Sequence, residues 1–303
     1  RRQRQMCIRD RHNKMAIKSY KGFDKNLRCR GFQYKIGGIY EMDGKIKMRN
    51  RGFHACESPF DVFDYYTMID SRFCEVEQDG NISKWDRGTK ICSSKIKIKA
   101  ELKLADMINL GVEWLKEITS PEKIKTSIKD NSSGNYAKIG SSGDEAQIGS
   151  SGYGAKIGSS GDEAQIGSSG NDAKIGSSGN DAKIGSSGND AQIGSSGNNA
   201  QIGSSGDGAK IGSSSDGAKI SSSGYGAKID STGEDCVIMC AGINSVAKAS
   251  KGSWVTLSEW SYSEEKQRYI PICVKTEFVD GEKIKADTYY SLKGGVFVEW
   301  IND

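Results

Sequence analysis

The apolar and polar positions in the middle of the chain follow a nine-residue repeat. From Ala137 onward the unit A-[KQ]-I-G-S-S-G-x-x recurs in eleven copies, with small variations in the last three. The alanine and isoleucine lie two residues apart, so both face one side of a strand, and the Lys or Gln between them faces water. The glycines and serines that follow favour a tight corner. Each unit is therefore predicted to be one short strand and one corner of a β-solenoid.

A longer period predicts the size of the coil. Lys and Gln alternate between the alanine and the isoleucine in the first copies, and Asp144-Glu145 returns as Asp162-Glu163. The early repeats are thus most alike at a spacing of 18 residues, which predicts two strands per coil. The same phase extends over 128–253, so we expect a narrow parallel β-solenoid of about seven coils, stacked about 4.8 Å apart.

Weaker patterns predict a domain on each side of the repeat. In 15–127, alternating stretches such as Lys95–Ile98 predict strands, and Ser58-Pro59 with Asp61 predicts a capped helix whose apolar stripe reaches Ile69. A second helix is expected near 112–118. In 254–303, glycine turns predict an antiparallel β meander that closes the solenoid. The predicted fold is mainly β, with an N-terminal α/β domain, the solenoid and a C-terminal cap.

Composition narrows the class of protein. The chain has 303 residues, of which 38 are glycine, 3 are proline and 35% are hydrophobic, which is too apolar for a disordered chain. No apolar run is long enough to cross a membrane, and no signal segment opens the chain. Eight cysteines without a C-x-x-C pair indicate reduced, buried thiols, and the two histidines argue against a metal site. We therefore expect a cytoplasmic protein with no membrane partner and no metal.

The first fourteen residues are predicted not to belong to the folded protein. Arg1–Arg11 resembles the peptide translated from sequencing-adapter DNA on a metagenomic contig, so 1–14 is interpreted as an adapter-derived or disordered tail and Met15 as the start. Residues 1–11 carry five arginines and Asp10, so without these eleven residues the net charge falls from +4 to 0. Nucleic acid is then not an expected partner, although a genuine basic arm is the alternative interpretation.

Three functions of the repeat compete with a scaffold or oligomerisation rod. Asp172, Asp181, Asp190 and Asp235 occupy the aspartate slot of calcium-binding nonapeptide rolls, but most copies lack it. Ice binding needs an outward threonine grid, whereas the outward slot here holds Lys or Gln. Nucleic-acid mimicry needs a denser charge than the net of about −5 on the array. A carbohydrate platform in the cap is a further alternative, from Trp260, Tyr289, Tyr290 and Trp300.

Three segments carry a resemblance to a known family. YKGFDKNLRCRGFQYKIGGIYE, RGFHACESPFDVFDYY and FCEVEQDG, followed by GSSG nonapeptides, resemble an uncharacterised family of gut Gram-positive bacteria and their phages. The resemblance implies a phage- or prophage-encoded protein that acts in the host cytoplasm. It brings no established activity, so the partner it suggests is a host protein.

The same segments are more distantly similar to ADP-ribosyltransferases of the poly(ADP-ribose) polymerase type. That similarity places NAD against Tyr20, Gly22, His54 and Tyr65, and it suggests His54, Tyr65 and Glu75 as catalytic residues. Lys21-Gly22 stands where that family has H-G or R-G, and no glutamate falls clearly at its catalytic position. Without that acid, nothing would steady the oxocarbenium-like centre as nicotinamide leaves.

The sequence thus favours a non-enzymatic interaction protein that binds a host macromolecule, needs no cofactor and uses the solenoid as a rigid scaffold or as a rod for homo-oligomers. The alternative is an NAD-using, ADP-ribosyltransferase-like enzyme in 15–127. Turnover of NAD would discriminate the two.

Overall fold

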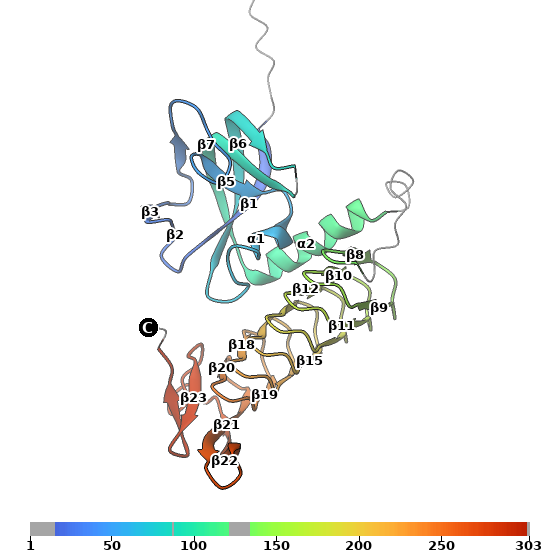
Figure 1. The fold of residues 1–303 in the computed structure, drawn as a ribbon, viewed down its shortest axis with the longest axis vertical. Helices are drawn as coiled ribbons and strands as arrows, with labels where there is room; N and C mark the ends of the chain where they lie inside the picture. Colours follow the sequence, from blue (N-terminus) through green and yellow to red (C-terminus); the bar gives the residue numbers. More distant parts are fainter. Residues whose placement is uncertain (1–15, 87, 121–133, 302–303) are drawn as a thin grey trace, which may run out of the picture.

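The computed structural model describes residues 16–86, 88–120 and 134–301. It consists of an N-terminal domain, a parallel β-solenoid and a C-terminal cap of antiparallel strands (Figure 1). The predicted tail at 1–14 lies outside the described residues. No helix in the described part of the chain is long and apolar enough to cross a membrane.

The N-terminal domain is built on an antiparallel sheet of five strands in the order β4-β7-β5-β1-β6. The two longest strands, β6 and β7, also pair with each other, so that the sheet closes on itself. A short hairpin, β2–β3, lies outside this sheet. The strands are β1 (Ile17–Phe23), β2 (Arg28–Cys29), β3 (Phe32–Gln33), β4 (Ile39–Glu41), β5 (Phe53–Cys56), β6 (Arg72–Lys84) and β7 (Lys90–Leu102).

Two helices lie between this sheet and the solenoid. In α1 (Pro59–Val62), the Ser58 side chain accepts a hydrogen bond from the Asp61 amide, as the capping pattern predicts. The helix ends after one turn and does not continue to Ile69. Beyond α1, the carbonyl of Phe63 and the amide of Met68 bond to Gln192 of the solenoid, so tertiary contacts replace helical hydrogen bonds. The second helix, α2 (Leu104–Ile118), is longer than predicted.

The solenoid has two strands per coil, and each strand pairs with the strand eighteen residues away. Ile157 pairs with Ile175, and Ile166 with Ile184, in parallel register. The predicted coil is thus confirmed. One sheet, called the covered sheet, contains β8 (Lys138–Ser141), β10 (Lys156–Ser159), β12 (Lys174–Ser177), β14 (Gln192–Ser195), β16 (Lys210–Ser213), β18 (Lys228–Ser231) and β20 (Val246–Lys248). The other, called the open sheet, contains β9 (Gln147–Ser150), β11 (Gln165–Ser168), β13 (Lys183–Ser186), β15 (Gln201–Ser204), β17 (Lys219–Ser222) and β19 (Val237–Cys240).

The core of the solenoid consists of inward alanines and isoleucines. Ala173 and Ile175 are fully buried, and Ile184 is 3% exposed. From Ser150 onward the first serine of each corner is also buried, but many of these hydroxyls, such as that of Ser177, have no hydrogen-bond partner among the described residues. In much of the ladder these hydroxyls therefore satisfy no backbone group of the corner.

Asparagine and aspartate side chains connect the corners instead. The Oδ1 atom of Asn171 accepts from the amide of Asn189 at 2.9 Å, and Asp162 accepts from Asn180 at 2.7 Å, each one coil further along. The residue after this ladder adopts positive φ, which Asn and Asp tolerate better than most side chains. This turn position is the one held by the four aspartates considered above for calcium, Asp172, Asp181, Asp190 and Asp235.

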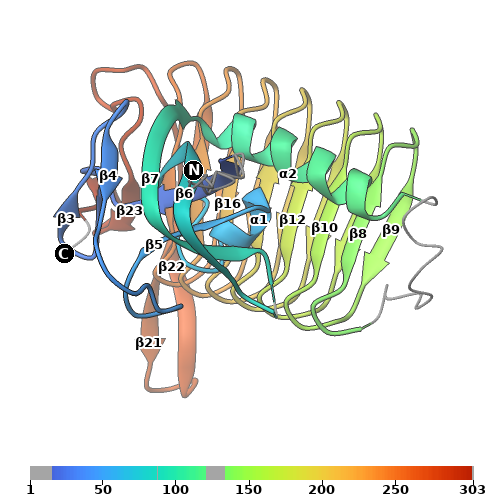
Figure 2. The same cartoon turned by 90° about the horizontal axis from the view of Figure 1, so that it is seen from above.

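The N-terminal domain sits on the covered sheet, and α2 runs along the rod across the strands (Figure 2). Glycines in the strands of the covered sheet let the helix approach the sheet closely. A methyl group on Gly194 would lie 2.6 Å from Ile108, and one on Gly212 would lie 2.4 Å from Leu104. The helix therefore depends on the glycine column beneath it.

Lysines of the covered sheet neutralise acids of the N-terminal domain. Lys156 Nζ lies 2.7 Å from Asp61 and 3.1 Å from Asp64, and Lys174 lies 2.7 Å from Asp64. Burial would raise the pKa of Asp61, but the Lys156 charge outweighs it and lowers that pKa. The Lys/Gln alternation in the early repeats thus corresponds to the two faces, because the lysines fall on the face that meets the acids.

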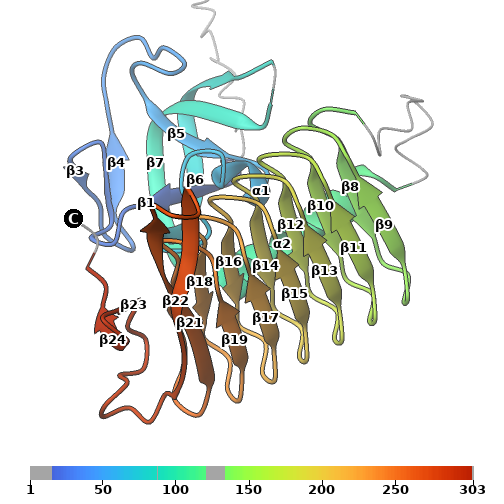
Figure 3. The ribbon, with the colours of Figure 1, turned by 60° about the horizontal axis from the view of Figure 1, so that its bottom comes forward.

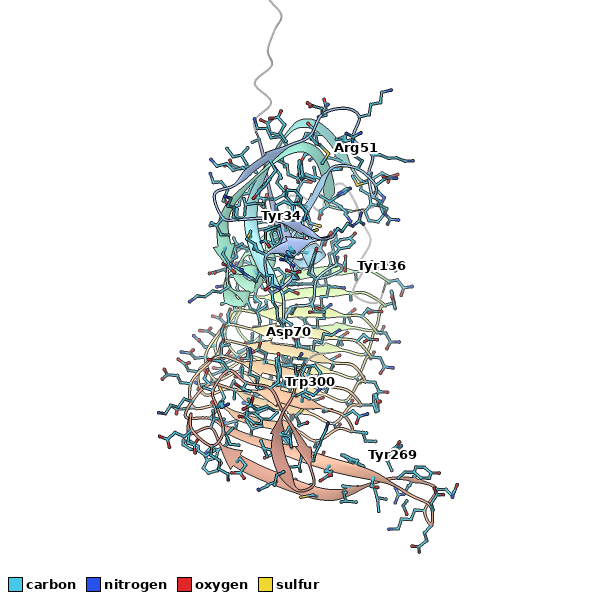
Figure 4. The ribbon with its side chains drawn as sticks, turned by 90° about the vertical axis from the view of Figure 1, so that its left-hand side faces the viewer. Tyr34, Arg51, Asp70, Tyr136, Tyr269 and Trp300 are labelled. Carbon is cyan, nitrogen blue, oxygen red and sulfur yellow. The ribbon has the colours of Figure 1, made fainter. Side chains whose placement is uncertain are left out.

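The C-terminal strands are antiparallel, as predicted, and form two hairpins that each extend one solenoid sheet. The β21–β22 hairpin continues the open sheet, and β23–β24 continues the covered sheet. The aromatic rings of Tyr289 and Trp300 flank Lys228, which also pairs with Asp70. Two of these residues, Asp70 and Trp300, are labelled in Figure 4. Lys228 therefore joins all three parts of the chain. The strands are β21 (Trp254–Ser263), β22 (Arg268–Phe278), β23 (Tyr290–Lys293) and β24 (Val296–Glu299).

The four aromatic side chains of the cap that were considered for carbohydrate binding mostly contact other residues of the protein. Tyr289 and Tyr290 are buried, and the Trp260 indole donates to the Ala241 carbonyl at 3.1 Å. Trp300 lies 4.2 Å from the Lys228 ammonium and contacts Tyr289. These contacts make the four rings structural parts of the cap.

Candidate functional site

A cavity of about 820 Å³ opens in the N-terminal domain. It is bounded by β1, the β2–β3 hairpin, β4, β5 and the segment that follows α1. This volume falls in the range of small-molecule and cofactor sites. The cavity is therefore the candidate functional site.

Aromatic rings form one wall of the cavity. Phe32, Tyr34 and Tyr40 pack edge to face, with ring centroids 4.8–5.5 Å apart. Tyr65 and Tyr66 contribute from beyond α1. Tyr34 is buried, which raises its pKa, so its hydroxyl stays protonated and can donate at neutral pH. This wall can hold a planar ring by stacking or by edge contacts.

Four cationic side chains line the same cavity: Lys21, Arg30, Arg49 and Lys90. No carboxylate among the described residues forms an ion pair with any of them. The single carboxylate in the lining, Glu41, lies 3.6 Å from Lys95. Burial and the charges of Arg49, Arg30 and Lys21 lower the pKa of Lys90, which shows how closely the cations are gathered. Their uncompensated charge makes the cavity attractive to anions.

Lys21 is the most deeply placed of the four cations. It is 5% exposed, and its ammonium donates to the His54 carbonyl at 3.0 Å and to the Cys29 sulfur at 3.4 Å. The rings of Phe23 and Tyr34 lie 5.3 and 5.7 Å away. An ammonium has three N–H donors, so one remains for a ligand. Burying a charge without an opposite charge is costly, and an anion in the cavity would relieve that cost.

His54 is held in its neutral form. Burial, with Lys90, Lys21 and Arg30, lowers its pKa to about 4. Its Nε2 atom accepts a hydrogen bond from the Arg49 amide at 3.0 Å, so the ring proton lies on Nδ1. The imidazole therefore fixes the loop that carries Arg49.

The structure brings most of the sequence-predicted site residues together. Tyr20, Gly22, His54 and Tyr65 all line this one cavity. Gly22 lacks a side chain where the Tyr66 ring packs on it, because a methyl group there would lie 2.5 Å from that ring. Glu75 is not part of the lining and pairs with Lys18 at 2.8 Å.

The described residues contain neither a reactive thiol at the cavity nor a cluster of side chains that could bind a metal ion. Cys56 borders the cavity, but burial raises its pKa to about 12, so it stays a thiol. All seven cysteines within the described ranges are free. In that same part of the chain, no group of three or more His, Cys, Asp or Glu side chains could hold a metal ion.

The sequence reasoning missed the cations that give the cavity its charge. Lys21 was noted only because it differs from the His or Arg that ADP-ribosyltransferases have at that position. Arg49 and Lys90 lie in segments with no recognisable motif. The available signal was the pairing of a basic residue with an aromatic run in each segment, as in Tyr20-Lys21 and Arg30-Gly31-Phe32. That signal is common in surface strands, so it did not indicate a cavity.

Comparison with known proteins finds a match only for the N-terminal domain. Residues 17–110 match a family model described as a domain of unknown function (DUF7666). No curated protein matches the chain, and no solved structure matches it. The match covers the closed sheet and the first part of α2, and therefore every residue that lines the cavity.

Proposed function

We propose that the chain is a non-catalytic binding protein whose N-terminal cavity takes a small anion bearing a planar ring, of the nucleotide class. The observation that carries this proposal is the buried ammonium of Lys21, which lies among three other cations and has no carboxylate partner among the described residues. Phosphate would meet the cations, and the ring would lie against the wall of Phe32, Tyr34 and Tyr40.

The solenoid supports this function as a rigid base. Its coils carry the N-terminal domain through α2, and the cap fixes the far end through Lys228. A rod of this kind suits the expected role of an intracellular scaffold that presents a ligand-binding domain to a host protein or to another copy of the chain. The phage or prophage origin implied by the family resemblance belongs to the same proposal.

Binding of ADP, measured by isothermal titration calorimetry, tests the cavity. We expect saturable binding that weakens as salt is raised, because the cations are partly screened by ions. Lys21→Met and Lys90→Met should each weaken ADP binding about tenfold or more, since each removes a charged hydrogen-bond donor. Lys99→Met is the matched control, because Lys99 is exposed on β7 and pairs with Glu77 outside the cavity. Equal affinity for all four proteins would contradict the proposal.

The second candidate function is an NAD-using, ADP-ribosyltransferase-like enzyme. It is favoured by the meeting of Tyr20, Gly22, His54 and Tyr65 at one cavity. Against it, the lining holds only the paired Glu41, and Glu75 lies elsewhere. Incubation with labelled NAD and lysate separates the two functions. Release of nicotinamide that is lost in Tyr65→Ala would establish the enzyme, whereas binding of NAD without turnover supports the binding protein.

A further inference from the structure

The two sheets of the solenoid present the same repeat to the outside, but only one is occupied. On the covered sheet, a glycine column at 140, 158, 176, 194 and 212 meets side chains of the N-terminal domain. On the open sheet, a methyl group added at Gly149, Gly167 or Gly185 would meet nothing within 4 Å. Figure 3 shows this sheet facing away from the N-terminal domain, with no helix or strand of the described residues across it.

The covered sheet shows what such a surface accepts. The α2 side chains that reach it are Leu104 at Gly212, Ile108 at Gly194, and Val112 with Leu115 at Gly158. From Leu104 to Leu115 the helix advances eleven residues, about 16.5 Å, while the glycines that it contacts advance three coils, about 14.4 Å. The spacing of helix side chains matches the spacing of the glycines because one helical turn rises about 5.4 Å and one coil rises about 4.8 Å. An α-helix parallel to the rod therefore fits a column of glycines spaced by single coils.

The open sheet has the further features of a docking surface. A groove of about 950 Å³ runs along it over β9 to β19. At its C-terminal end, Val237, Met239 and Trp254 are each about half exposed, and Trp254 contacts Phe278 on the next strand. Contiguous exposed apolar side chains of this kind mark interaction sites.

Charge indicates the kind of helix. Lys156 and Lys174 of the covered sheet meet carboxylates, whereas Lys183 is exposed on the open sheet and no acid among the described residues pairs with it. Lys219 repeats this two coils away, about 10 Å along the rod. Carboxylates two helical turns apart, at i and i+7, would meet both lysines.

We infer that the open sheet binds an amphipathic α-helix of a partner protein, with aliphatic residues at i, i+4, i+8 and i+11 over the glycines and acidic residues beside them. The helix would lie along the rod, as α2 does on the opposite face. This inference is independent of the cavity and of any nucleotide.

A hydrocarbon-stapled, fluorescent peptide with the sequence of residues 103–119 is the probe, because its aliphatic stripe already fits the equivalent surface. In the probe, Asn109→Glu and Lys116→Glu place two carboxylates seven residues apart at the edge of this stripe, because the native Asp106 and Glu113 lie on the opposite, exposed side of the helix. We expect fluorescence anisotropy to show saturable binding to the full chain. Gly185→Leu should weaken this binding at least tenfold by placing a side chain in the groove, and the fold should be preserved because a Cβ at this position meets nothing within 4 Å.

Two controls make the test specific to this face. Gly143→Leu places the same side chain in open space at a corner and should bind like the parent chain. Lys183→Glu should weaken binding, and a peptide with Asn109→Lys and the native Lys116 should recover it. Absence of peptide binding to the parent chain, or equal binding by Gly185→Leu, would overturn the inference. Self-association of the parent that is lost in Gly185→Leu would assign the face to a second copy and would also overturn it.

Discussion

The buried serines in the corners of the solenoid differ in whether their hydroxyl groups make hydrogen bonds. Ser177 is fully buried, and its hydroxyl has no hydrogen-bond partner in the described structure. Ser213 occupies the same position two coils further along, but its hydroxyl accepts from the Ser215 amide at 3.2 Å. The two serines are therefore a matched pair with different hydrogen bonding.

Ser177→Ala should leave the free energy of unfolding unchanged or raise it by up to about 1 kcal/mol, because an unsatisfied polar group leaves the interior. Ser213→Ala should lower it by about 1 kcal/mol, because a buried amide loses its acceptor. Urea denaturation of the two variants measures the difference. Greater destabilisation by Ser177→Ala would show that its hydroxyl has a partner that stabilises the fold.

His54 predicts a specific loss of stability in acid. Its folded pKa of about 4 lies below its ordinary value of 6.5, so the unfolded chain binds the proton more readily between these two pH values. The free energy of unfolding should therefore fall as pH drops from 6.5 to 4. The share due to His54 should be about 1 kcal/mol, because the imidazole is only half-buried and solvent screens it.

His54→Gln isolates this contribution, since the amide oxygen can still accept from the Arg49 backbone. The variant should lose stability less steeply than the parent over this pH range, as followed by thermal melts in matched buffers. Parallel curves for both proteins would mean that His54 does not titrate differently on folding.

At the scale of the strand, the orientation of the repeat is tested by two neighbouring residues. Ile184 is 3% exposed and lies in register with Ile166 and Ile202 of the adjoining coils. Ile184→Asp would bury an unpaired charge in a thin core and should cost several kcal/mol. Lys183→Asp, one residue away and outward, should change stability by about 0.5 kcal/mol or less. Thermal melts that rank the two in the opposite order would contradict the assigned orientation.

The strands and the coil could be predicted from sequence because their cause is local and repeated. Each copy of A-[KQ]-I-G-S-S-G-x-x carries its own apolar pair and its own corner, so eleven copies report one geometry. The short helix α1 was overestimated for the opposite reason. Its apolar stripe is helical in spacing, but Gln192, more than a hundred residues away, takes the backbone groups that would have continued it.

At the scale of the whole molecule, the two faces of the rod give the same residue type opposite roles. Lys156 on the covered sheet is buried between Asp61 and Asp64, whereas Lys183 on the open sheet is exposed. Lys156→Ala should cost about 3 kcal/mol, because it leaves Asp61 buried without its counter-charge. Lys183→Ala should cost about 0.5 kcal/mol or less. Urea titrations measure both, and equal effects would show that Asp61 and Asp64 do not need Lys156.

Contacts between segments that are distant in the sequence could not be predicted from it. The Lys/Gln alternation was visible and was used to count strands per coil, but its cause is a set of acids in another domain. In the cavity, four of the five residues suggested by the distant resemblance meet. The charge that defines the site comes from Lys21, Arg30, Arg49 and Lys90, which meet only when the sheet closes.

The measurement that tests the central claim most directly is photo-crosslinking with 8-azido-ADP, followed by peptide mapping of the labelled chain. The account predicts that the label falls on cavity residues such as Tyr34, Tyr40 and Tyr65, that unlabelled ADP competes with it, and that Lys21→Met reduces it. Labelling confined to the solenoid, or labelling that excess ADP does not reduce, would contradict a nucleotide-binding cavity in the N-terminal domain.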